Sequence, residues 1–328
     1  MIQPLLIYIN MDPLKISTAQ FENRSGDKNY NLSVMESLAA KAAAEGSDVI
    51  AFHECSITGY TFARHLNREQ MLELAEFIPS GESVSRLIGI AARFKITVLA
   101  GLFEKDADEK IYKAYVCVDG NGLIACHRKI HPFINAFITP GDRYTVFEIA
   151  GWKCGILICY DNNVVENVRA TALLGASILF MPHVTMCTPS PRPGSGFVDP
   201  ELWKNRDRDT EALRAEFDGP KGREWLMKWL PSRAHDNGIY VVFSNPIGMD
   251  EDQLKNGCAM ILDPFGNIMT ECRTLGDDFV SAVITPEELT AAGGYRYTKA
   301  RRPVLYRDII GKDHIPEQKV AWMGKQDD

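Results

Sequence analysis

The sequence lacks two features that would point to common functional classes, a C-x-x-C cysteine pair and an excess of basic residues, and we expect no secretory signal. Because there are no C-x-x-C pairs and the only tight His/Cys spacing lies on single strands, zinc and dithiol motifs have no support, so we expect neither metal nor cofactor. The formal net charge of −7 argues against nucleic acid and anionic membranes as partners.

The apolar run nearest the start, Leu5 to Ile9, is short, and no basic residues precede it. No small-residue cleavage site follows it, so we expect residues 1–13 to be an N-terminal extension and not a signal peptide. Several of the eight cysteines, such as Cys117 and Cys154, lie in apolar strand-like runs. Such cysteines are usually buried free thiols, and together with the missing signal they predict a cytoplasmic protein.

Strand-like and helix-like segments alternate along the chain, and hairpin signals occur at Asp119 to Gly122 and Asp263 to Asn267. Helical spacing is clearest over residues 27–45, 83–94, 164–174 and 222–236. No internal repeat or Gly/Ser linker divides the chain, so we expect one α/β domain over residues 1–328. Amphipathic helices would cover one face of each sheet, and the other faces could pack together.

Residues 185–217 differ in texture, because they are rich in proline and charge and show no clean strand period. We expect a long insertion near the functional site that carries one short helix. A segment of this length is either a functional lid or a surface decoration, and the pattern favours neither.

Three reactive side chains each follow an apolar strand-like run. Glu54 lies in DVIAFHECSITGY, Lys129 in GLIACHRKIHPF and Cys159 in CGILICYDNN. Loops at strand ends collect functional residues, because a rigid sheet positions them. Each residue alone has an ordinary explanation as a surface charge or a buried thiol.

Together the three supply the groups that cysteine hydrolysis needs. A free thiol is mostly protonated at neutral pH, since its pKa is near ~8.5. Glu54 can accept the proton of Cys159 as general base, and Lys129 can favour the thiolate and stabilise the oxyanion. Glu54 can later protonate the leaving amine and activate water.

These segments resemble, in the same order, the glutamate, lysine and cysteine motifs of the nitrilase superfamily, the carbon–nitrogen hydrolases. His53 stands where that family usually has proline before the glutamate. The segments SRAHDNGIYVVFSNPIG and GCAMILDPFGNI are also similar to the family, so the resemblance extends from Lys15 to about Ile309.

The resemblance implies a four-layer αββα sandwich that forms homodimers or higher homo-oligomers. It also implies a cysteine thioester opened by water, with the oxyanion held by Lys129 and the backbone N–H of Tyr160. Members with Cys-Tyr-Asp, as in Cys159-Tyr160-Asp161, often act on amides or N-carbamoyl compounds. We therefore expect a small linear amide or N-carbamoyl substrate, and a nitrile-acting or acyl-transferring enzyme is the alternative.

One departure from the family pattern leaves the activity open. The family commonly has a second glutamate after the lysine, but Ile130 to Thr139 contains no carboxylate, and Ala136 stands near the expected position. Its loss could alter specificity, bring in another carboxylate, or mark a catalytically silent relative that acts as a binding or assembly module. Asn135 is polar and close to that position.

Other residues beside the motifs are weaker candidates. Tyr60 and Asn162 are expected to shape the pocket, and His183 follows an apolar strand and could face it. The rival mechanism is a Cys–His dyad that uses His53 or His131.

Two tryptophans on the helix expected over residues 222–236 have a more ordinary interpretation. Trp225 and Trp229 are spaced i, i+4, which predicts packing along one helix face.

Overall fold

A computed structural model describes residues 11–188 and 192–314, and it contains two six-stranded mixed sheets. The first has the order β14-β1-β2-β3-β4-β5, from β1 (Leu14–Gln20), β2 (Val49–Ala51), β3 (Thr97–Lys105), β4 (Ile111–Asp119), β5 (Gly122–Arg128) and β14 (Asp278–Ile284). The second has the order β13-β12-β9-β8-β7-β6, from β6 (Thr145–Ile149), β7 (Trp152–Ile156), β8 (Ile178–Pro182), β9 (Tyr240–Ser244), β12 (Met260–Leu262) and β13 (Ile268–Glu271). A separate hairpin joins β10 (Ile247–Asp250) to β11 (Gln253–Asn256).

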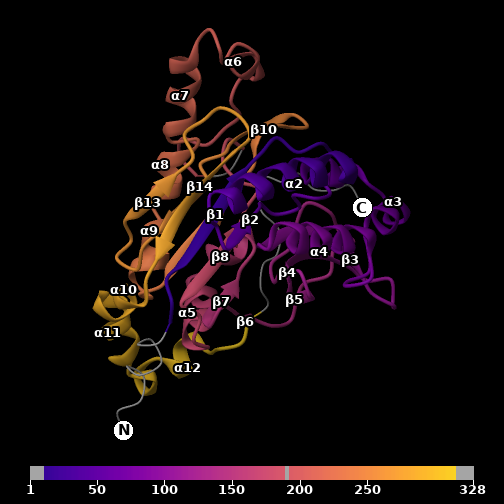
Figure 1. The fold of residues 1–328 in the computed structure, drawn as a ribbon. Coiled ribbons are helices and arrows are strands. Elements are labelled where there is room, and N and C mark those ends of the chain that lie inside the picture. Colours follow the sequence, from indigo (N-terminus) through magenta and orange to yellow (C-terminus); the bar gives the residue numbers. More distant parts are fainter. Residues whose placement is uncertain (1–10, 189–191, 315–328) are drawn as a thin grey trace.

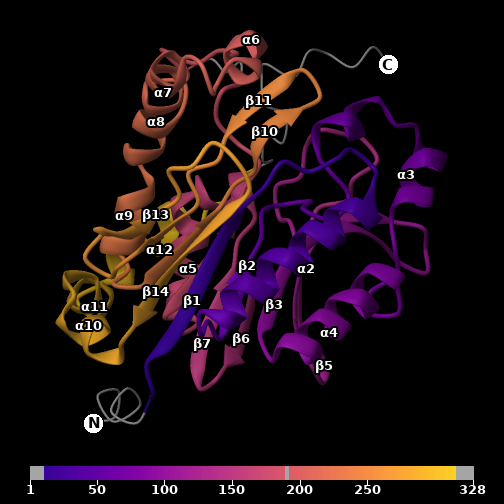
Figure 2. The ribbon, with the colours of Figure 1, turned by 45° about the horizontal axis from the view of Figure 1, so that its top comes forward.

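Helices cover the outer face of each sheet (Figures 1 and 2). The first sheet is covered by α2 (Lys28–Ala44) and α4 (Glu82–Phe94), and the second by α5 (Val165–Leu173) and α9 (Leu230–His235). The helices α8 (Arg223–Met227) and α7 (Thr210–Asp218) continue from α9 toward one end of the sandwich (Figure 1). The spacing of Val84, Leu87 and Ile90 shows why α4 lies there, because these apolar residues share one face and are all buried. The predicted four-layer αββα sandwich is confirmed.

The inner faces of the two sheets form a common core, as the period-two alternation of each strand requires. On β8, Ile178 and Phe180 point into this core, whereas Leu179 and Met181 pack toward the outer helices. Strands β1-β2-β3 and β7-β8-β9 pair in parallel at the centre of their sheets, so the carboxyl ends of β2, β7 and β8 can collect functional loops.

Shorter elements complete the chain: η1 (Thr61–His65), α3 (Arg68–Leu74), η2 (Cys159–Asn162), α6 (Pro200–Lys204), α10 (Pro286–Ala291), α11 (Gly293–Lys299), η3 (Pro303–Leu305) and α12 (Arg307–Ile310). Most of the predicted extension 1–13 lies outside the described residues, although the carbonyl of Asp12 accepts a hydrogen bond from Trp152 Nε1. Within the described ranges, no helix has the length and apolarity needed to cross a membrane.

The segment 185–217 contains two helices where the sequence predicted one. Asp199 caps the start of α6 and Asp209 caps the start of α7, each by accepting a backbone N–H with its side chain. Figure 1 shows α6 and α7 projecting from one end of the sandwich.

The single helix predicted over residues 222–236 was wrong, because it is broken into α8 and α9. Pro231 has no backbone N–H, and its ring would clash with the carbonyl of residue 227, so the helix cannot continue across it.

The turn after β2, which carries Glu54, lies directly on β3. Ile57 N donates to Gly101 O at 3.0 Å, and Gly101 N donates to Ser56 Oγ at 3.1 Å. A Cβ atom at Gly101 would lie 2.3 Å from the backbone nitrogen of Cys55. Only glycine therefore lets the turn approach the strand this closely.

We expect Gly101→Ala to destabilise the protein by about 1–3 kcal/mol, because the added methyl group must displace backbone. Gly89→Ala is the matched control, since a Cβ there meets nothing within 4 Å in the interior of α4. Helix propensity should make that variant more stable by about 0.5–1 kcal/mol. Denaturant unfolding measures both, and a Gly101→Ala protein as stable as wild type would refute the close packing.

Candidate active site

Glu54 and Lys129 form a buried ion pair between strands that are far apart in sequence. Glu54 follows β2 and Lys129 follows β5, and Lys129 Nζ donates to Glu54 Oε1 at 2.7 Å. Both side chains are almost completely shielded from solvent. Burial alone would lower the pKa of Lys129, but the neighbouring charges of Glu54, Cys159 and Asp161 raise it, so this ammonium stays protonated.

A second buried lysine, which the sequence reasoning missed, also reaches Glu54. Lys113 Nζ lies 3.7 Å from Glu54 Oε1, donates to Phe133 O at 2.6 Å and sits 4.3 Å from the centre of the Tyr60 ring. Burial, followed by the like charge of Lys129, lowers the pKa of Lys113 to about 8. Strand alternation was the available signal, because position 113 shares its face with Tyr115 in the core between the sheets.

Cys159 begins the 3-10 turn η2 just beyond β7 and has a φ of 52°, which is uncommon for a residue other than glycine. Such backbone strain is characteristic of functional turns. Burial raises the pKa of Cys159 to about 11, although the charge of Lys129 opposes this. The thiol is therefore protonated at neutral pH.

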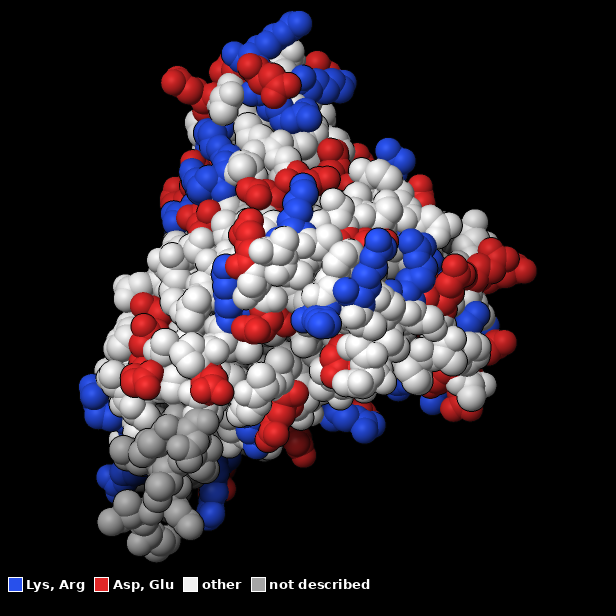
Figure 3. Space-filling model, viewed as in Figure 1, with Lys and Arg blue, Asp and Glu red and all other residues white. Residues whose placement is uncertain are grey.

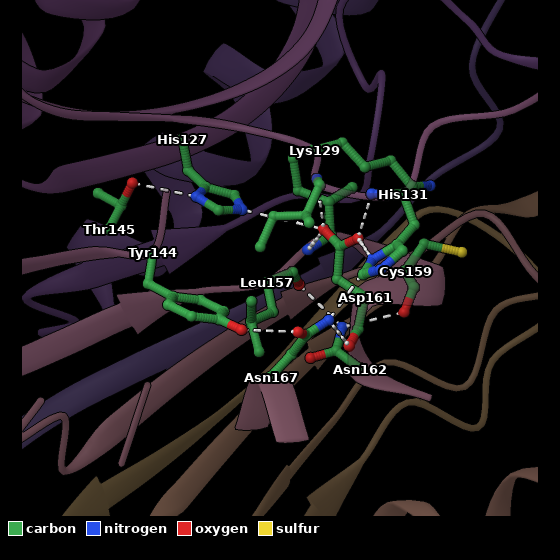
Figure 4. Close-up of polar contacts among 12 residues, drawn as sticks. His127, Lys129, His131, Tyr144, Thr145, Leu157, Cys159, Asp161, Asn162 and Asn167 are labelled. Atoms are coloured by element: carbon green, nitrogen blue, oxygen red, sulfur yellow. Dashed lines mark hydrogen bonds and ion pairs between the residues drawn. The ribbon is translucent and has the colours of Figure 1, made fainter. Parts of the chain in front are cut away.

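The carboxylate of Asp161 connects the loop that follows Lys129 to the turn that begins at Cys159. It accepts hydrogen bonds from the backbone N–H groups of Ile130 at 3.2 Å, His131 at 2.8 Å and Ile158 at 3.2 Å (Figure 4). Burial would raise its pKa, but hydrogen bonds from histidine side chains hold the pKa of Asp161 well below its usual range. This fixed anion holds both loops in place, and Figure 4 shows the Lys129 and Cys159 side chains extending to the same side of it.

Asn162 and His183 lie behind the cysteine turn. Asn162 Nδ2 donates to Leu157 O at 2.8 Å and to Cys159 O at 3.2 Å, and lies 3.1 Å from His183 Nε2. The His183 ring is stacked on Trp229, with ring centroids 5.6 Å apart. Burial lowers the pKa of His183 far below its ordinary value, so the ring is neutral and can accept from Asn162. These contacts stabilise the turn that carries Cys159.

The histidines of the rival dyad have other neighbours. The His53 ring packs 4.6 Å from the Phe21 ring, and burial lowers the pKa of His53 to about 3. The backbone N–H of His131 donates to Asp161, and its Nδ1 lies 3.0 Å from the same carboxylate. Neither arrangement directs an imidazole toward the sulfur of Cys159.

A cavity of about 130 Å³ opens beside Cys159. Tyr60 and Tyr160 line it, as do Thr185, Thr188 and Arg192 of the segment 185–217. The remaining described lining residues are Phe133, Ile134, Asn163, Val184, Trp225, Gln253 and Lys255. Asn162 and His183 are not among these lining residues.

Trp225 does more than the helix packing that its spacing predicted. Its ring meets Trp229 edge to face, with centroids 5.7 Å apart, but it also forms part of the cavity wall. The break at Pro231 puts the two tryptophans outside a common helix, since Trp225 belongs to α8 and Trp229 precedes α9.

Ala136, near the position expected for the second glutamate, is exposed and follows the buried Asn135. Asn135 Nδ2 donates to Ala63 O and Leu66 O, both at 2.8 Å, which anchors the loop that contains Ala136. Lys113, a cation, is the additional charged group that reaches Glu54. Among the described residues, no cluster of three or more His, Cys, Asp or Glu side chains could hold a metal ion.

Comparisons with known proteins agree on one family. The family described as carbon-nitrogen hydrolase matches residues 15–293. A nitrilase of Pyrococcus abyssi is 36% identical over 74% of this chain and 78% of its own length. An (R)-stereoselective amidase of a Pseudomonas species is 29% identical over 89% of this chain and 93% of its own length.

A solved structure shares the fold. It is a mutant of an amidase of the nitrilase superfamily from Nesterenkonia AN1, and it matches with a TM-score of 0.68 and 20% identity over 92% of this chain and 98% of that one. The family match covers most of the sequence, and the layered fold agrees with it. The chain therefore belongs to the carbon–nitrogen hydrolases of the nitrilase superfamily and is an amidohydrolase of non-peptide carbon–nitrogen bonds.

Proposed function

We propose that this enzyme hydrolyses a small linear amide or N-carbamoyl compound through a thioester on Cys159. The observation that carries the proposal is the opening of a small cavity onto the Cys159 turn, with the buried pair of Glu54 and Lys129 acting electrostatically on that thiol. Nucleophile, base and cation are thereby gathered from three separate strand ends.

In the first step, Glu54 takes the thiol proton as the sulfur of Cys159 attacks the substrate carbonyl carbon. A general base is required, because burial keeps the thiol protonated. The negative oxygen that forms is stabilised by the Lys129 ammonium and by the backbone N–H of Tyr160. That N–H lies at the start of η2, where a helical turn leaves its first donors without partners inside the turn.

In the second step, the tetrahedral intermediate collapses and the carbon–nitrogen bond breaks. Glu54 gives its proton to the leaving nitrogen, which departs as ammonia or an amine and leaves an acyl thioester on Cys159. Water then attacks the thioester as Glu54 accepts its proton, and the acid is released with the thiol restored. Lys129 holds Glu54 in position through both steps.

The choice of an amide over a nitrile rests on Cys159-Tyr160-Asp161, the arrangement of many amidases and N-carbamoyl hydrolases. A relative named as an amidase over most of the chain agrees with it. A cavity of about 130 Å³ has room for a small substrate. Tyr60 and Tyr160 would shape this pocket, while Asn162 and His183 would brace the nucleophile from behind.

We also propose a homodimer, because apolar side chains are exposed on α5 and the C-terminal segment. These residues are Val165, Leu173, Leu174, Val304, Leu305, Ile309 and Ile310. The two segments lie near each other, because the charges of Arg301 and Tyr306 influence the pKa of Arg169 on α5. Both ribbon views place α5 beside α12. A joint apolar patch of this kind is typical of an interface.

The substitution Ile309→Asp should shift the assembly toward monomer, since it puts a charge into an apolar contact. Light scattering coupled to size exclusion measures the mass. Phe77→Asp is the control, because Phe77 is an exposed apolar residue between α3 and α4. A wild-type chain that is monomeric at micromolar concentration would contradict the proposal.

Substituting Cys159→Ala should abolish ammonia release from small amides, a loss of at least about 10³-fold. An activated ester should label wild type at Cys159, as mass spectrometry can show. Cys126→Ser is the control, because Cys126 is a half-buried thiol on β5 away from the cavity. Unlabelled Cys159 and no hydrolysis would indicate the silent relative, and hydroxamate formed with added hydroxylamine would indicate acyl transfer.

The kcat/KM of the enzyme should fall as pH rises through about 8, where Lys113 loses its proton and Glu54 loses a cationic neighbour. Lys113→Met should remove this decline above pH 8 and lower activity at pH 7 by about tenfold, because a buried charge that favours the Cys159 thiolate is lost. Lys110→Met, at an exposed lysine, is the control and should keep the decline of kcat/KM above pH 8. A Lys113→Met enzyme with the same decline would show that another group titrates.

A further inference from the structure

We propose that the amide substrate carries a carboxylate at the end away from the scissile bond, and that Lys255 and Arg192 recognise it. This inference rests on the proposed hydrolysis at Cys159 and names the chemical class of its substrate. Both cationic residues line the cavity that opens beside Cys159.

Lys255 is a buried cation whose described hydrogen bond goes to a neutral group. It lies on the hairpin strand β11, is 1% exposed, and its Nζ donates to Gln253 Oε1 at 2.8 Å. The nearby carboxylate of Asp250 is engaged by Thr61, through its backbone N–H at 3.2 Å and its hydroxyl. An ammonium has three donors, and burying one without an anion in contact is costly.

Lys255 also shares an electrostatic environment with the nucleophile. Burial lowers its pKa, while the charges of Asp250, Cys187 and Cys159 oppose that shift. A ligand attached at Cys159 can therefore extend toward this ammonium within one small cavity.

Arg192 supplies a second cation from the segment 185–217. Its guanidinium lies 4.1 Å from the centre of the Trp225 ring, and its Nη2 donates to Lys221 O at 3.1 Å. The stacking fixes the plane of the guanidinium, which favours recognition of a planar carboxylate. Among the described residues that line the cavity, none is Asp or Glu.

The positive charge is a local property of the cavity and not part of a basic surface. The face in Figure 3 intersperses Lys and Arg with Asp and Glu, and the whole chain is acidic. A carboxylate on a small ligand would give Lys255 an anionic partner through a charge-assisted hydrogen bond, which is stronger than a bond to a neutral group, and Arg192 would add a second cation in the same cavity.

The wild-type enzyme gives the first test, with ammonia release measured for three amides of similar size. Succinamate carries the carboxylate, its methyl ester removes only the charge, and butyramide lacks the group. We expect kcat/KM for succinamate to exceed that of both others by about 10- to 100-fold, the range of one or two charge-assisted hydrogen bonds. Equal values for succinamate and its ester would overturn the inference.

Lys255→Met provides the second test, because it keeps the length of the side chain and removes the ammonium. We expect it to lower kcat/KM for succinamate at least about tenfold, and to lower that for butyramide by less. The exposed Lys228→Met is the matched control and should keep the preference for succinamate. A Lys255→Met enzyme with the wild-type preference would overturn the role of Lys255.

A third measurement holds even where the variant does not fold. Succinate should inhibit wild-type hydrolysis of butyramide competitively and 1,4-diaminobutane should not, whereas the reverse order would overturn the inference. The two proposals also fail differently. No ammonia from any amide, with no adduct at Cys159, refutes the hydrolysis itself, whereas butyramide hydrolysis without a carboxylate preference refutes only the substrate class.

Discussion

The segment from Lys129 to His131 is held between two buried carboxylates, and the arrangement of the site depends on that constraint. Glu54 accepts from the ammonium of Lys129, while Asp161 accepts from the backbone N–H groups of Ile130 and His131. Glu54 comes from the first sheet and Asp161 from the turn after β7 in the second. The segment therefore connects the two sheets at the edge where Cys159 lies. Breaking a buried pair of this kind leaves an uncompensated charge, so its members depend on one another.

The same burial that fixes the ion pair sets the chemistry of the thiol. Removing water strengthens every electrostatic interaction in the site, but it also disfavours a free thiolate, and the pKa of Cys159 rises to about 11. Such a site does not store a charged nucleophile. In the proposed mechanism, the thiolate forms only as the proton passes to Glu54 and the new negative charge moves onto the substrate oxygen, where Lys129 would stabilise it.

Much of the fold, and the placement of Glu54, Lys129 and Cys159 at strand ends, could be predicted, because strand ends and period-two patterns are local signals. Glu54, Lys129 and Cys159 each follow an apolar run, and the layered architecture follows from amphipathic helices beside alternating strands. The cavity wall could not be predicted in the same way. Lys255 lies on a short hairpin almost a hundred residues after the nucleophile, and only tertiary packing brings it to the cavity. Lys113 was predictable in principle, since a lysine on the inner face of an apolar strand must have a partner.

The absence of a second carboxylate near Ala136 affects the electrostatic field of the same site. Around Glu54 itself, two ammonium groups, those of Lys129 and Lys113, face one carboxylate, while Asp161 lies behind the Lys129 loop, and Lys255 adds a further cation at the cavity wall. A second glutamate would cancel part of this field. Without it, the field favours the oxyanion of the tetrahedral intermediate and any anionic group on the substrate. Two lysines around the Glu54 carboxylate are therefore a physically coherent alternative to two glutamates, and under the proposed substrate class they would favour substrates that bring their own negative charge.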